Sequence, residues 1–263
     1  MHVALVGAEF EENLAVRYLW GALEAAGHQV TPIVFNRAED LESAARQLVA
    51  TGAELAGFSM VFTYRAREFA HLATRARELG YAGVCVAGGH FAAFNAERLL
   101  ADIPAFDAVA CGEGEILLCE LARALTRKRG LARIDGLVWR DGNRLRRNRA
   151  AIKPPNLDVL TPPPRKRPLD DYLGLGITNI LSSRGCTYGC AFCSIAAWHR
   201  LCGGPRLRLR AVESVADEMA ALYRDGARIF NFHDDNFFPP DPEQRWHRVH
   251  ALKTALERRD VHG

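Results

Sequence analysis

The stretch SSRGCTYGCAFCS, residues 182–194, holds three of the chain's seven cysteines and marks the chemistry around which the rest is organised. Cys186, Cys190 and Cys193 are spaced C-x3-C-x2-C. A short loop of this kind brings three thiolates to one point, and thiolates bind iron–sulfur clusters and zinc. Three cysteines leave one iron of a four-iron cluster without a protein ligand, so that iron is open to a substrate or cosubstrate.

The residues alone leave two other interpretations open. One is a structural zinc site in which Cys202 or His199 supplies the fourth ligand. The other is a set of reduced cysteines that bind no metal. These alternatives differ in whether the chain is a redox enzyme.

Composition narrows the class of protein. The chain has 263 residues, of which 49% are hydrophobic and 25% charged, and this is typical of a globular protein with one or two domains. A net charge of +3 is too small to indicate a nucleic-acid partner. No apolar run reaches membrane-spanning length, and we expect no signal peptide because the first residues lack a basic region and lead directly into a strand. The clustered cysteines favour a reducing cytoplasm over disulfides.

The N-terminal half alternates short apolar runs with helical patterns. Strands are predicted at 3–7, 29–34, 54–60, 84–87 and 107–111, and helices at 11–26, 40–51, 65–79, 95–101 and 115–127. Asp40 is expected to be the N-cap of the second helix. Continuous apolar strands separated by helices predict a parallel α/β sheet of the flavodoxin or Rossmann type, with helices on both faces.

Such sheets bind ligands beyond the carboxyl ends of their strands. The loops expected there carry glycine or small residues, at Gly7–Glu9, Ser59–Thr63, Gly88–His90 and Gly112–Glu115. Glycine lets the backbone approach a ligand closely. Neither a GxGxxG nor a P-loop motif is present, so the residues by themselves indicate only a small-molecule pocket.

The second half begins after a β-hairpin at 134–148, whose turn is Asp141-Gly142. We predict a first domain over 1–150, a proline-rich linker over 151–170 and a second domain over 171–263. A strand at 176–183 enters the cysteine loop. A helix at 211–224, a strand at 228–233 and a helix at 241–258 follow, with Asp234-Asp235-Asn236-Phe237 at the carboxyl end of the second strand.

These motifs together resemble a known family. The loop CTYGCAFC at 186–193, with GGHFAAF at 88–94 and CGEGE at 111–115, is similar to the cobalamin-binding class of radical S-adenosylmethionine (SAM) enzymes. The resemblance implies that Cys186, Cys190 and Cys193 hold a [4Fe–4S] cluster. It places Phe192 near the SAM adenine, and Asp235 and Asn236 near the SAM amino and methionyl end.

The resemblance also implies a cobalamin site. The residues expected to contact cobalamin are Ser59, Gly88, Gly89, His90, Gly112, Glu113 and Gly114. The motif D-x-H-x-x-G, which supplies an axial histidine in corrinoid methyltransferases, is missing. We expect His90 to contact the ligand edge or the backbone and not the cobalt.

The family chemistry is reductive cleavage of SAM, followed by methylation or rearrangement of an unactivated carbon of a small molecule. It implies an electron donor such as flavodoxin or ferredoxin. The alternative is a corrinoid-binding module whose second domain is non-catalytic.

The second domain is short for this family. From residue 170 onward only about 90 residues remain, whereas a full eightfold barrel needs roughly 250. The sequence thus predicts the first two β/α units of an incomplete barrel, with an exposed parallel edge after the strand at 228–233. A fragment, a truncated gene product or a second chain that completes the barrel would each account for the shortfall.

Overall fold

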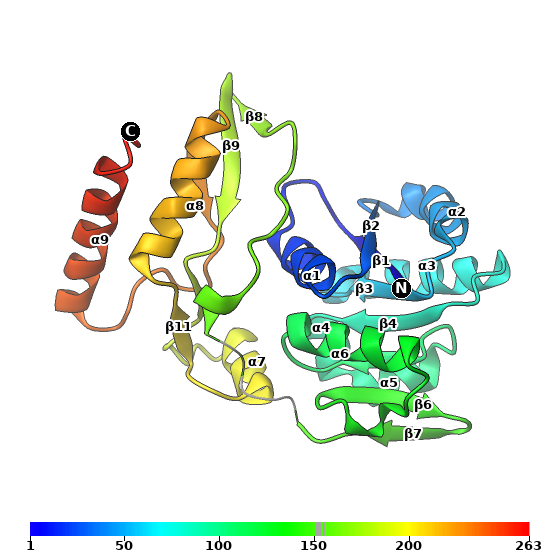
Figure 1. The fold of residues 1–263 in the computed structure, drawn as a ribbon. Helices are drawn as coiled ribbons and strands as arrows, with labels where there is room; N and C mark the ends of the chain where they lie inside the picture. The colour runs from blue at the N-terminus through cyan, green and yellow to red at the C-terminus, as the bar shows by residue number, and fades with distance from the viewer. Residues whose placement is uncertain (151–153, 155, 263) are drawn as a thin grey trace. The chain divides into compact units, whose positions relative to one another are not determined.

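The computed structural model describes residues 1–150, 154 and 156–262, and the chain divides into two compact units (Figure 1). Unit 1 comprises residues 1–154, 161–164 and 201–203, and unit 2 comprises residues 155–160, 165–200 and 204–263. Part of the predicted linker, 151–153 and 155, lies outside the described residues. The described linker has a 3-10 turn at Leu157–Val159.

Unit 1 is built on a seven-stranded sheet in the order β2-β1-β3-β4-β5-β6-β7 (Figure 1). The strands are β1 (His2–Gly7), β2 (Gln29–Val34), β3 (Leu55–Ser59), β4 (Val84–Gly88), β5 (Ala108–Ala110), β6 (Leu137–Asp141) and β7 (Arg144–Arg147). The first five are parallel, and β6 and β7 extend the sheet as an antiparallel hairpin. The predicted α/β fold class is confirmed.

The strand order reverses direction at β1, which has β2 on one side and β3 on the other. Because crossovers between parallel strands are right-handed, this reversal sends the helices to opposite faces. The helices are α1 (Leu14–Ala25), α2 (Leu41–Thr51), α3 (Ala66–Glu78), α4 (His90–Phe94), α5 (Ala96–Asp102) and α6 (Gly114–Thr126). Helix α1 packs with α6, and α2 packs with α3.

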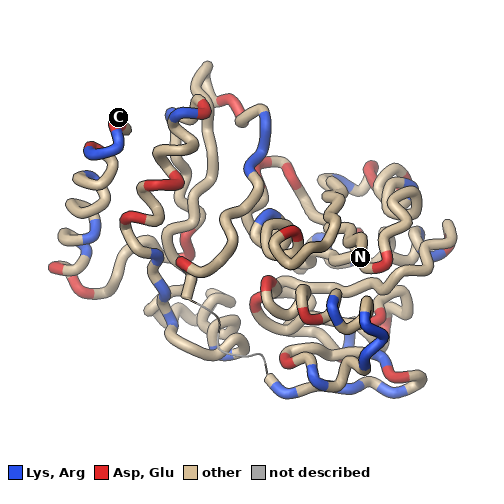
Figure 2. Tube along the Cα trace, viewed as in Figure 1, with Lys and Arg blue, Asp and Glu red and all other residues tan. Residues whose placement is uncertain are grey.

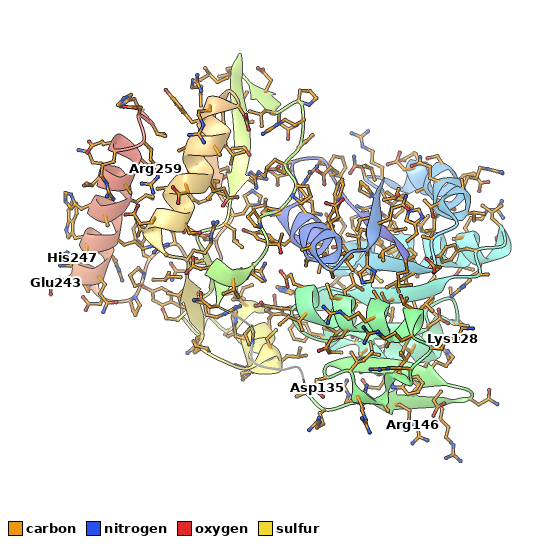
Figure 3. The ribbon with its side chains drawn as sticks, in the orientation of Figure 1. Lys128, Asp135, Arg146, Glu243, His247 and Arg259 are labelled. Atoms are coloured by element: carbon orange, nitrogen blue, oxygen red, sulfur yellow. The ribbon has the colours of Figure 1, made fainter. Side chains whose placement is uncertain are left out.

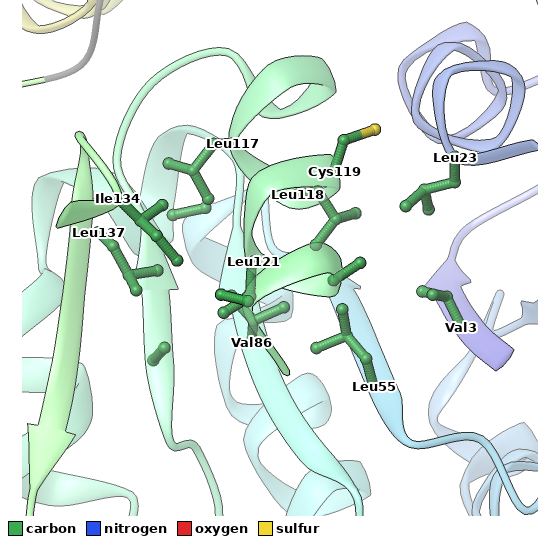
Figure 4. Packing of buried hydrophobic residues seen from close by; sticks show 14 of the residues in the cluster. Val3, Leu23, Leu55, Val86, Leu117, Leu118, Cys119, Leu121, Ile134 and Leu137 are labelled. Carbon is green, nitrogen blue, oxygen red and sulfur yellow. The ribbon is translucent and has the colours of Figure 1, made fainter. Parts of the chain in front are cut away.

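One face of the sheet and two helices share an apolar core (Figure 4). Val3, Leu55 and Val86 of neighbouring strands meet Leu23 of α1 and Leu121 of α6 there. Alternate strand residues supply this face because side chains of a strand point to opposite sides in turn. This core holds the parallel strands in register, so that their carboxyl ends form one edge.

The sequence predicted these elements to within a few residues, with two differences. Asp40 is the N-cap residue of α2, as predicted, but its side chain makes no capping hydrogen bond there; it also ends a 3-10 turn over Ala38–Asp40, and its Oδ2 accepts hydrogen bonds from the amides of Asn36 and Arg37 at 3.0 and 2.9 Å. Helix α4 was not predicted as a separate element. It has only five residues, too few to show helical periodicity.

Unit 2 contains a three-stranded sheet in the order β12-β9-β8 and a two-stranded β10-β11 sheet. Its strands are β8 (Asp170–Tyr172), β9 (Leu175–Ile180), β10 (Ser183–Gly185), β11 (Leu207–Leu209) and β12 (Ala227–Phe232), and its helices are α7 (Ile195–Cys202), α8 (Val212–Arg224) and α9 (Pro242–Glu257). Strands β9 and β12 are parallel, and β12 lies at the edge of the described sheet.

The helices of unit 2 are held by apolar packing and by ion pairs. Ile180 of β9 and Val215 and Leu222 of α8 lie in one buried cluster. At the end of α9, Arg259 pairs with both Glu213 and Asp217 of α8 at 2.8 Å (Figure 3). Strands β8, β10 and β11 were not predicted as separate elements, because strands of three residues give almost no periodic signal. Helix α7, of eight residues, was not predicted either.

The arginines of the hairpin lie along β6 and β7 (Figure 2). Arg146 pairs with Asp141 at 3.2 Å, Arg147 with Glu97 at 2.5 Å, and Arg149 with Asp135 at 3.4 Å. These arginines are therefore paired with carboxylates at the surface of the hairpin and of the neighbouring helix. Among the described residues, no helix is long and apolar enough to cross a membrane.

The packing of the core predicts which substitutions in unit 1 lower the free energy of unfolding. Leu121 is fully buried, whereas Ile116 on the same helix is 42% exposed. Leu121→Ala is expected to lower the free energy of unfolding by about 2–5 kcal/mol, because it removes a buried side chain and leaves a cavity. Ile116→Ala is expected to change it by less than about 0.5 kcal/mol. Urea unfolding followed by circular dichroism measures both, and equal effects of the two changes would contradict this packing.

Candidate functional site

The cysteine loop of unit 2 lies between β10 and α7. Its interior turns back on itself, because the amide of Cys193 donates to the carbonyl of Cys190 at 3.2 Å. Arg206, just before β11, donates to the carbonyl of Tyr188 at 2.6 Å and so ties the loop to the two-stranded sheet. The loop is therefore held by one hydrogen bond within itself and by one from Arg206.

Gly185 is the residue that lets the chain enter this loop. Its φ is +99°, a conformation that favours glycine. A Cβ atom there would lie 2.1 Å from the carbonyl oxygen of Arg206 and 2.8 Å from Nε2 of His199. A side chain at position 185 would therefore displace the backbone that leads directly to Cys186.

Burial separates the loop cysteines from the others. Cys186 and Cys193 are half-buried and Cys190 is exposed, whereas Cys85, Cys111, Cys119 and Cys202 are buried. Burial raises the pKa of the Cys85 thiol to about 12 and that of Cys111 to about 11. Because the thiolate is the metal ligand, those two thiols are poorly suited to bind a metal, and the accessible donors are the three loop cysteines.

The three loop thiols are not gathered around one point in this structure. Across 1–150, 154 and 156–262, no three His, Cys, Asp or Glu side chains are grouped closely enough to hold a metal ion. The chemistry of the donor set nevertheless fits an iron–sulfur cluster, since three accessible thiols lie within eight residues on one loop. Binding would have to draw the three sulfur atoms together, as is usual where metal binding is coupled to local folding.

The residues that follow β12 hold in place the residues that lead from β9 into the cysteine loop. One carboxylate oxygen of Asp234 accepts hydrogen bonds from the amides of Ser182 and Ser183 at 2.7 and 2.9 Å, and the other accepts from the Ser182 hydroxyl at 2.5 Å. Ser182 and Ser183 are almost fully buried, so Asp234 satisfies polar groups that water cannot reach.

The next two residues continue the same contact. Asp235 accepts from the amide of Gly185 at 2.9 Å. The side-chain nitrogen of Asn236 lies 3.7 Å from the sulfur of Cys186, and the backbone carbonyl of Asn236 accepts from the Ser183 hydroxyl at 2.8 Å. Both predicted SAM residues thus lie beside the cysteine loop, and each already contacts its backbone or a thiol.

Two arginines hold the opposite, carbonyl side of the same segment. Arg210 donates to the carbonyl of Leu181 at 2.7 Å and pairs with Glu218 at 2.5 Å. Arg248 of α9 donates to the carbonyl of Ser182 at 3.1 Å, and burial lowers the pKa of its guanidinium. The chain between β9 and Cys186 is therefore held through its N–H groups by carboxylates and through its carbonyls by guanidinium groups.

His199, which the zinc interpretation invoked as a ligand, is 4% exposed on α7. Its Nε2 lies 3.9 Å from Oδ2 of Asp235, and within the described part of the chain neither ring nitrogen has a hydrogen-bond partner.

Phe192, in contrast, is 93% exposed. An aromatic ring so open to water on this loop is available to pack against a planar ligand.

In unit 1, the predicted cobalamin residues gather at the carboxyl edge of the sheet. Ser59 ends β3 and pairs with Gly88, the last residue of β4. Gly89 has a φ of +91°, and a Cβ atom there would lie 3.0 Å from the carbonyl oxygen of Met60. The strand order reverses between β1 and β3, and open parallel sheets bind ligands at the carboxyl edge beside such a reversal.

The remaining predicted residues lie on the two helices that follow β4 and β5. His90 is the first residue of α4, and its ring centroid lies 6.3 Å from that of Phe94. Gly112 has a φ of +127° and Glu113 is the N-cap of α6. Gly114 packs on Leu19, because a Cβ atom there would lie 2.7 Å from that side chain, so helix packing by itself accounts for this glycine.

Sequence reasoning did not single out a set of exposed aromatic rings at this edge, although Phe62 lies in the candidate ligand loop at 59–63. Phe62 and Tyr64, in the segment after β3, are 57% and 77% exposed, and their rings stack with centroids 5.7 Å apart. Phe10, after β1, is 60% exposed and lies under the guanidinium of Arg37, which follows β2. These aromatic residues follow predicted strands closely in the sequence, and that position could have indicated that they lie at the ligand-binding edge.

Comparisons with known proteins agree with this geometry. Residues 3–122 match the B12 binding domain family. The chain is 34% identical over 163 residues to an uncharacterised methyltransferase of Pyrococcus horikoshii, covering 58% of this chain and 33% of that protein. It is 27% identical to the anaerobic magnesium-protoporphyrin IX monomethyl ester cyclase of Rubrivivax gelatinosus, covering 95% of this chain and 45% of that protein.

Solved structures extend the likeness to the whole fold. The radical SAM methyltransferase TsrM from Kitasatospora setae, solved with tryptophan and a SAM analogue, superposes with a TM-score of 0.76 at 23% identity over 99% of this chain and 52% of that chain. The cobalamin-dependent radical SAM enzyme OxsB, solved with aqua-cobalamin and SAM, superposes with a TM-score of 0.73 at 20% identity over 98% of this chain and 37% of that chain.

Residues 3–122 thus match the B12 binding domain family, in agreement with the parallel sheet and its carboxyl edge. The chain as a whole has the fold of the cobalamin-dependent radical SAM enzymes, and the resemblance drawn from the sequence is confirmed. The chain spans between a third and about half of the length of these relatives.

The difference in burial predicts which thiols react. A maleimide applied at neutral pH to the folded, metal-free chain is expected to label Cys186, Cys190 and Cys193 and to leave the four buried cysteines unmodified. Mass spectrometry of peptides identifies the labelled sites. Labelling in denaturant is the control and should reach all seven cysteines. Rapid labelling of Cys202 in the folded chain would contradict this assignment.

The hydrogen bonds of Asp234 predict a local loss of order. Asp234→Ala leaves two buried amides and one hydroxyl without their acceptor, at about 1–3 kcal/mol for each group left unsatisfied. Hydrogen exchange at residues 181–186 is expected to become faster. Asp217→Ala, which removes only an exposed ion pair with Arg259, is the matched control and should leave that segment unchanged.

Proposed function

We propose that this chain is part of a cobalamin-dependent radical SAM methyltransferase that acts on a small molecule. The observation that carries the proposal is the loop of three accessible thiols, entered through a segment that is hydrogen-bonded on both sides, in a chain whose residues 3–122 match the B12 binding domain family. The relatives include proteins named as methyltransferases and a ring-closing cyclase, which supports methyl transfer first and rearrangement second.

In this proposal, Cys186, Cys190 and Cys193 bind a [4Fe–4S] cluster and leave one iron for SAM. The chemistry that these cofactors supply is one-electron cleavage of SAM and methyl transfer to an unactivated carbon. Phe192 covers the adenine, and Asp235 and Asn236 line the methionyl end. The buried arginines and Asp234 keep the loop entrance fixed, so that binding of the cofactors reorganises only the exposed part of the loop.

Cobalamin binds at the carboxyl edge of the sheet in unit 1. The residues proposed to contact it are Ser59, Gly88, Gly89, His90, Gly112, Glu113 and Gly114, together with the exposed rings of Phe62 and Tyr64. A large planar ligand there would remove these rings from water, at roughly 25 cal/mol for each Å² of apolar surface buried. His90 contacts the ligand edge or the backbone and not the cobalt.

The proposal places the protein in the reducing cytoplasm, where flavodoxin or ferredoxin supplies the electron. The predicted domains, 1–150, 151–170 and 171–263, are then the cobalamin domain, the linker and the start of the radical SAM domain. The second candidate is a corrinoid-binding module or one part of a split enzyme. What favours it is β12, a parallel strand at the edge of the described sheet, onto which a further strand could pair.

Anaerobic reconstitution with iron and sulfide tests the first candidate. The reduced protein is expected to give a cubane signal in electron paramagnetic resonance, and SAM is expected to shift that signal because it binds the open iron. Replacing Cys186, Cys190 and Cys193 together by alanine should abolish the signal.

Cobalamin binding, followed by the absorbance of the corrin, distinguishes the two candidates. Cobalamin that binds the wild-type chain and the triple-alanine variant equally, with no cluster in either, would favour the corrinoid module. A cluster that does not respond to SAM would contradict the enzyme reading of this chain.

A further inference from the structure

The side chain of Asn236 contacts the sulfur of Cys186. Its Nδ2 lies 3.7 Å from Sγ, within the range of N–H···S hydrogen bonds. Both side chains are half-buried, so the contact is partly shielded from water. A neutral amide donor thus already faces the first of the three loop thiols.

The orientation of the Asn236 amide is fixed by a second hydrogen bond. Its Oδ1 accepts from the amide of Phe238 at 3.1 Å, an Asx turn within the segment after β12. Oxygen and nitrogen of an amide side chain are distinguished by their hydrogen bonds, and a backbone N–H at one end requires the oxygen there. The end directed at Cys186 is therefore the N–H donor.

The backbone on both sides of this contact is also held. The carbonyl of Asn236 accepts from the Ser183 hydroxyl, and the two preceding residues, Asp234 and Asp235, bond to the amides of Ser182, Ser183 and Gly185. Ser183 and Gly185 are held in addition by the antiparallel pairing of β10 with β11. Asn236 is thus set in place before any cluster binds.

We propose that Asn236 is a positioning residue that raises the reduction potential of the cluster through this hydrogen bond to Cys186. The inference rests on the proposed function, because it requires a cluster on Cys186. One-electron reduction adds negative charge to the iron–sulfur core and its thiolates. An N–H dipole directed at a thiolate stabilises that charge, and hydrogen bonds to sulfur are among the factors that set cluster potentials.

The test is a redox titration of the reconstituted protein with mediators, in which electron paramagnetic resonance measures the reduced cluster. Asn236→Ser keeps an oxygen that can accept from Phe238 but removes the donor to Cys186. Asn236→Asp keeps the shape and the acceptor and replaces the donor by a carboxylate. Asn231→Ser, on β12, is the control; its side chain donates to Asn179 and not to a cysteine.

Both Asn236 variants are expected to have a lower midpoint potential than the wild type. For the loss of one hydrogen bond in Asn236→Ser, the ratio of reduced to oxidised cluster at a fixed potential should fall about threefold to tenfold. Tenfold corresponds to about 59 mV for a one-electron couple. Asn236→Asp should fall further, since it also adds a negative charge, and Asn231→Ser should match the wild type.

The outcomes separate this inference from the function on which it rests. A wild-type chain that forms no cluster would overturn both. A cluster whose potential is the same in the wild type and in both Asn236 variants would overturn the role of Asn236 alone. Loss of the cluster in both Asn236 variants, with normal loading of Asn231→Ser, would replace the redox role by a purely structural one.

Discussion

The parallel pairing of β9 with β12 is the constraint on which the candidate site depends. It aligns Ile180 with Phe232, so the two strands end together and the segments that follow them leave side by side. Asp234 and Asp235 then meet the backbone amides of Ser182 and Gly185, and the Asn236 side chain meets the Cys186 sulfur, with no loop closure beyond the one that pairs the two strands. The cost of ordering an exposed, glycine-bearing loop is thereby confined to the residues beyond Cys186.

There is a physical reason why carboxylates bond the N–H groups of that segment and arginines bond its carbonyls. A chain leaving a parallel sheet has unpaired N–H and C=O groups, and burying them without partners would be unfavourable. Here carboxylates accept from the N–H groups, and Arg210 and Arg248 donate to the carbonyls. The carboxylates and the guanidinium groups lie on opposite sides of this segment, and their charges offset each other. The buried segment is therefore held by charged groups, yet little net charge lies near the thiols.

Much of this could be predicted from the sequence, because the strands of unit 1 are continuous apolar runs and the cysteine spacing is specific. The hydrogen bonds that hold the segment before Cys186 could not be predicted. Asp234 is one acidic residue after a strand, and nothing local distinguishes a carboxylate that accepts from Ser182 and Ser183 from one that faces a ligand. The partners lie about fifty residues apart in the chain, and only the register of β9 and β12 brings them together.

The exposed aromatic rings of the two units fit the cofactors proposed for them. The rings of Phe62 and Tyr64 in unit 1 and of Phe192 in unit 2 are large apolar groups left in water, each in a segment that sequence and fold associate with a planar cofactor. The backbone beneath them is, by contrast, tightly bonded. A rigid base that carries exposed rings lowers the entropy lost on binding, because only side chains need to be ordered when the ligand arrives. The strongest bracing in unit 2 lies just before Cys186, where the loop must be fixed, and the most exposed residues lie beyond it, where a cofactor must enter.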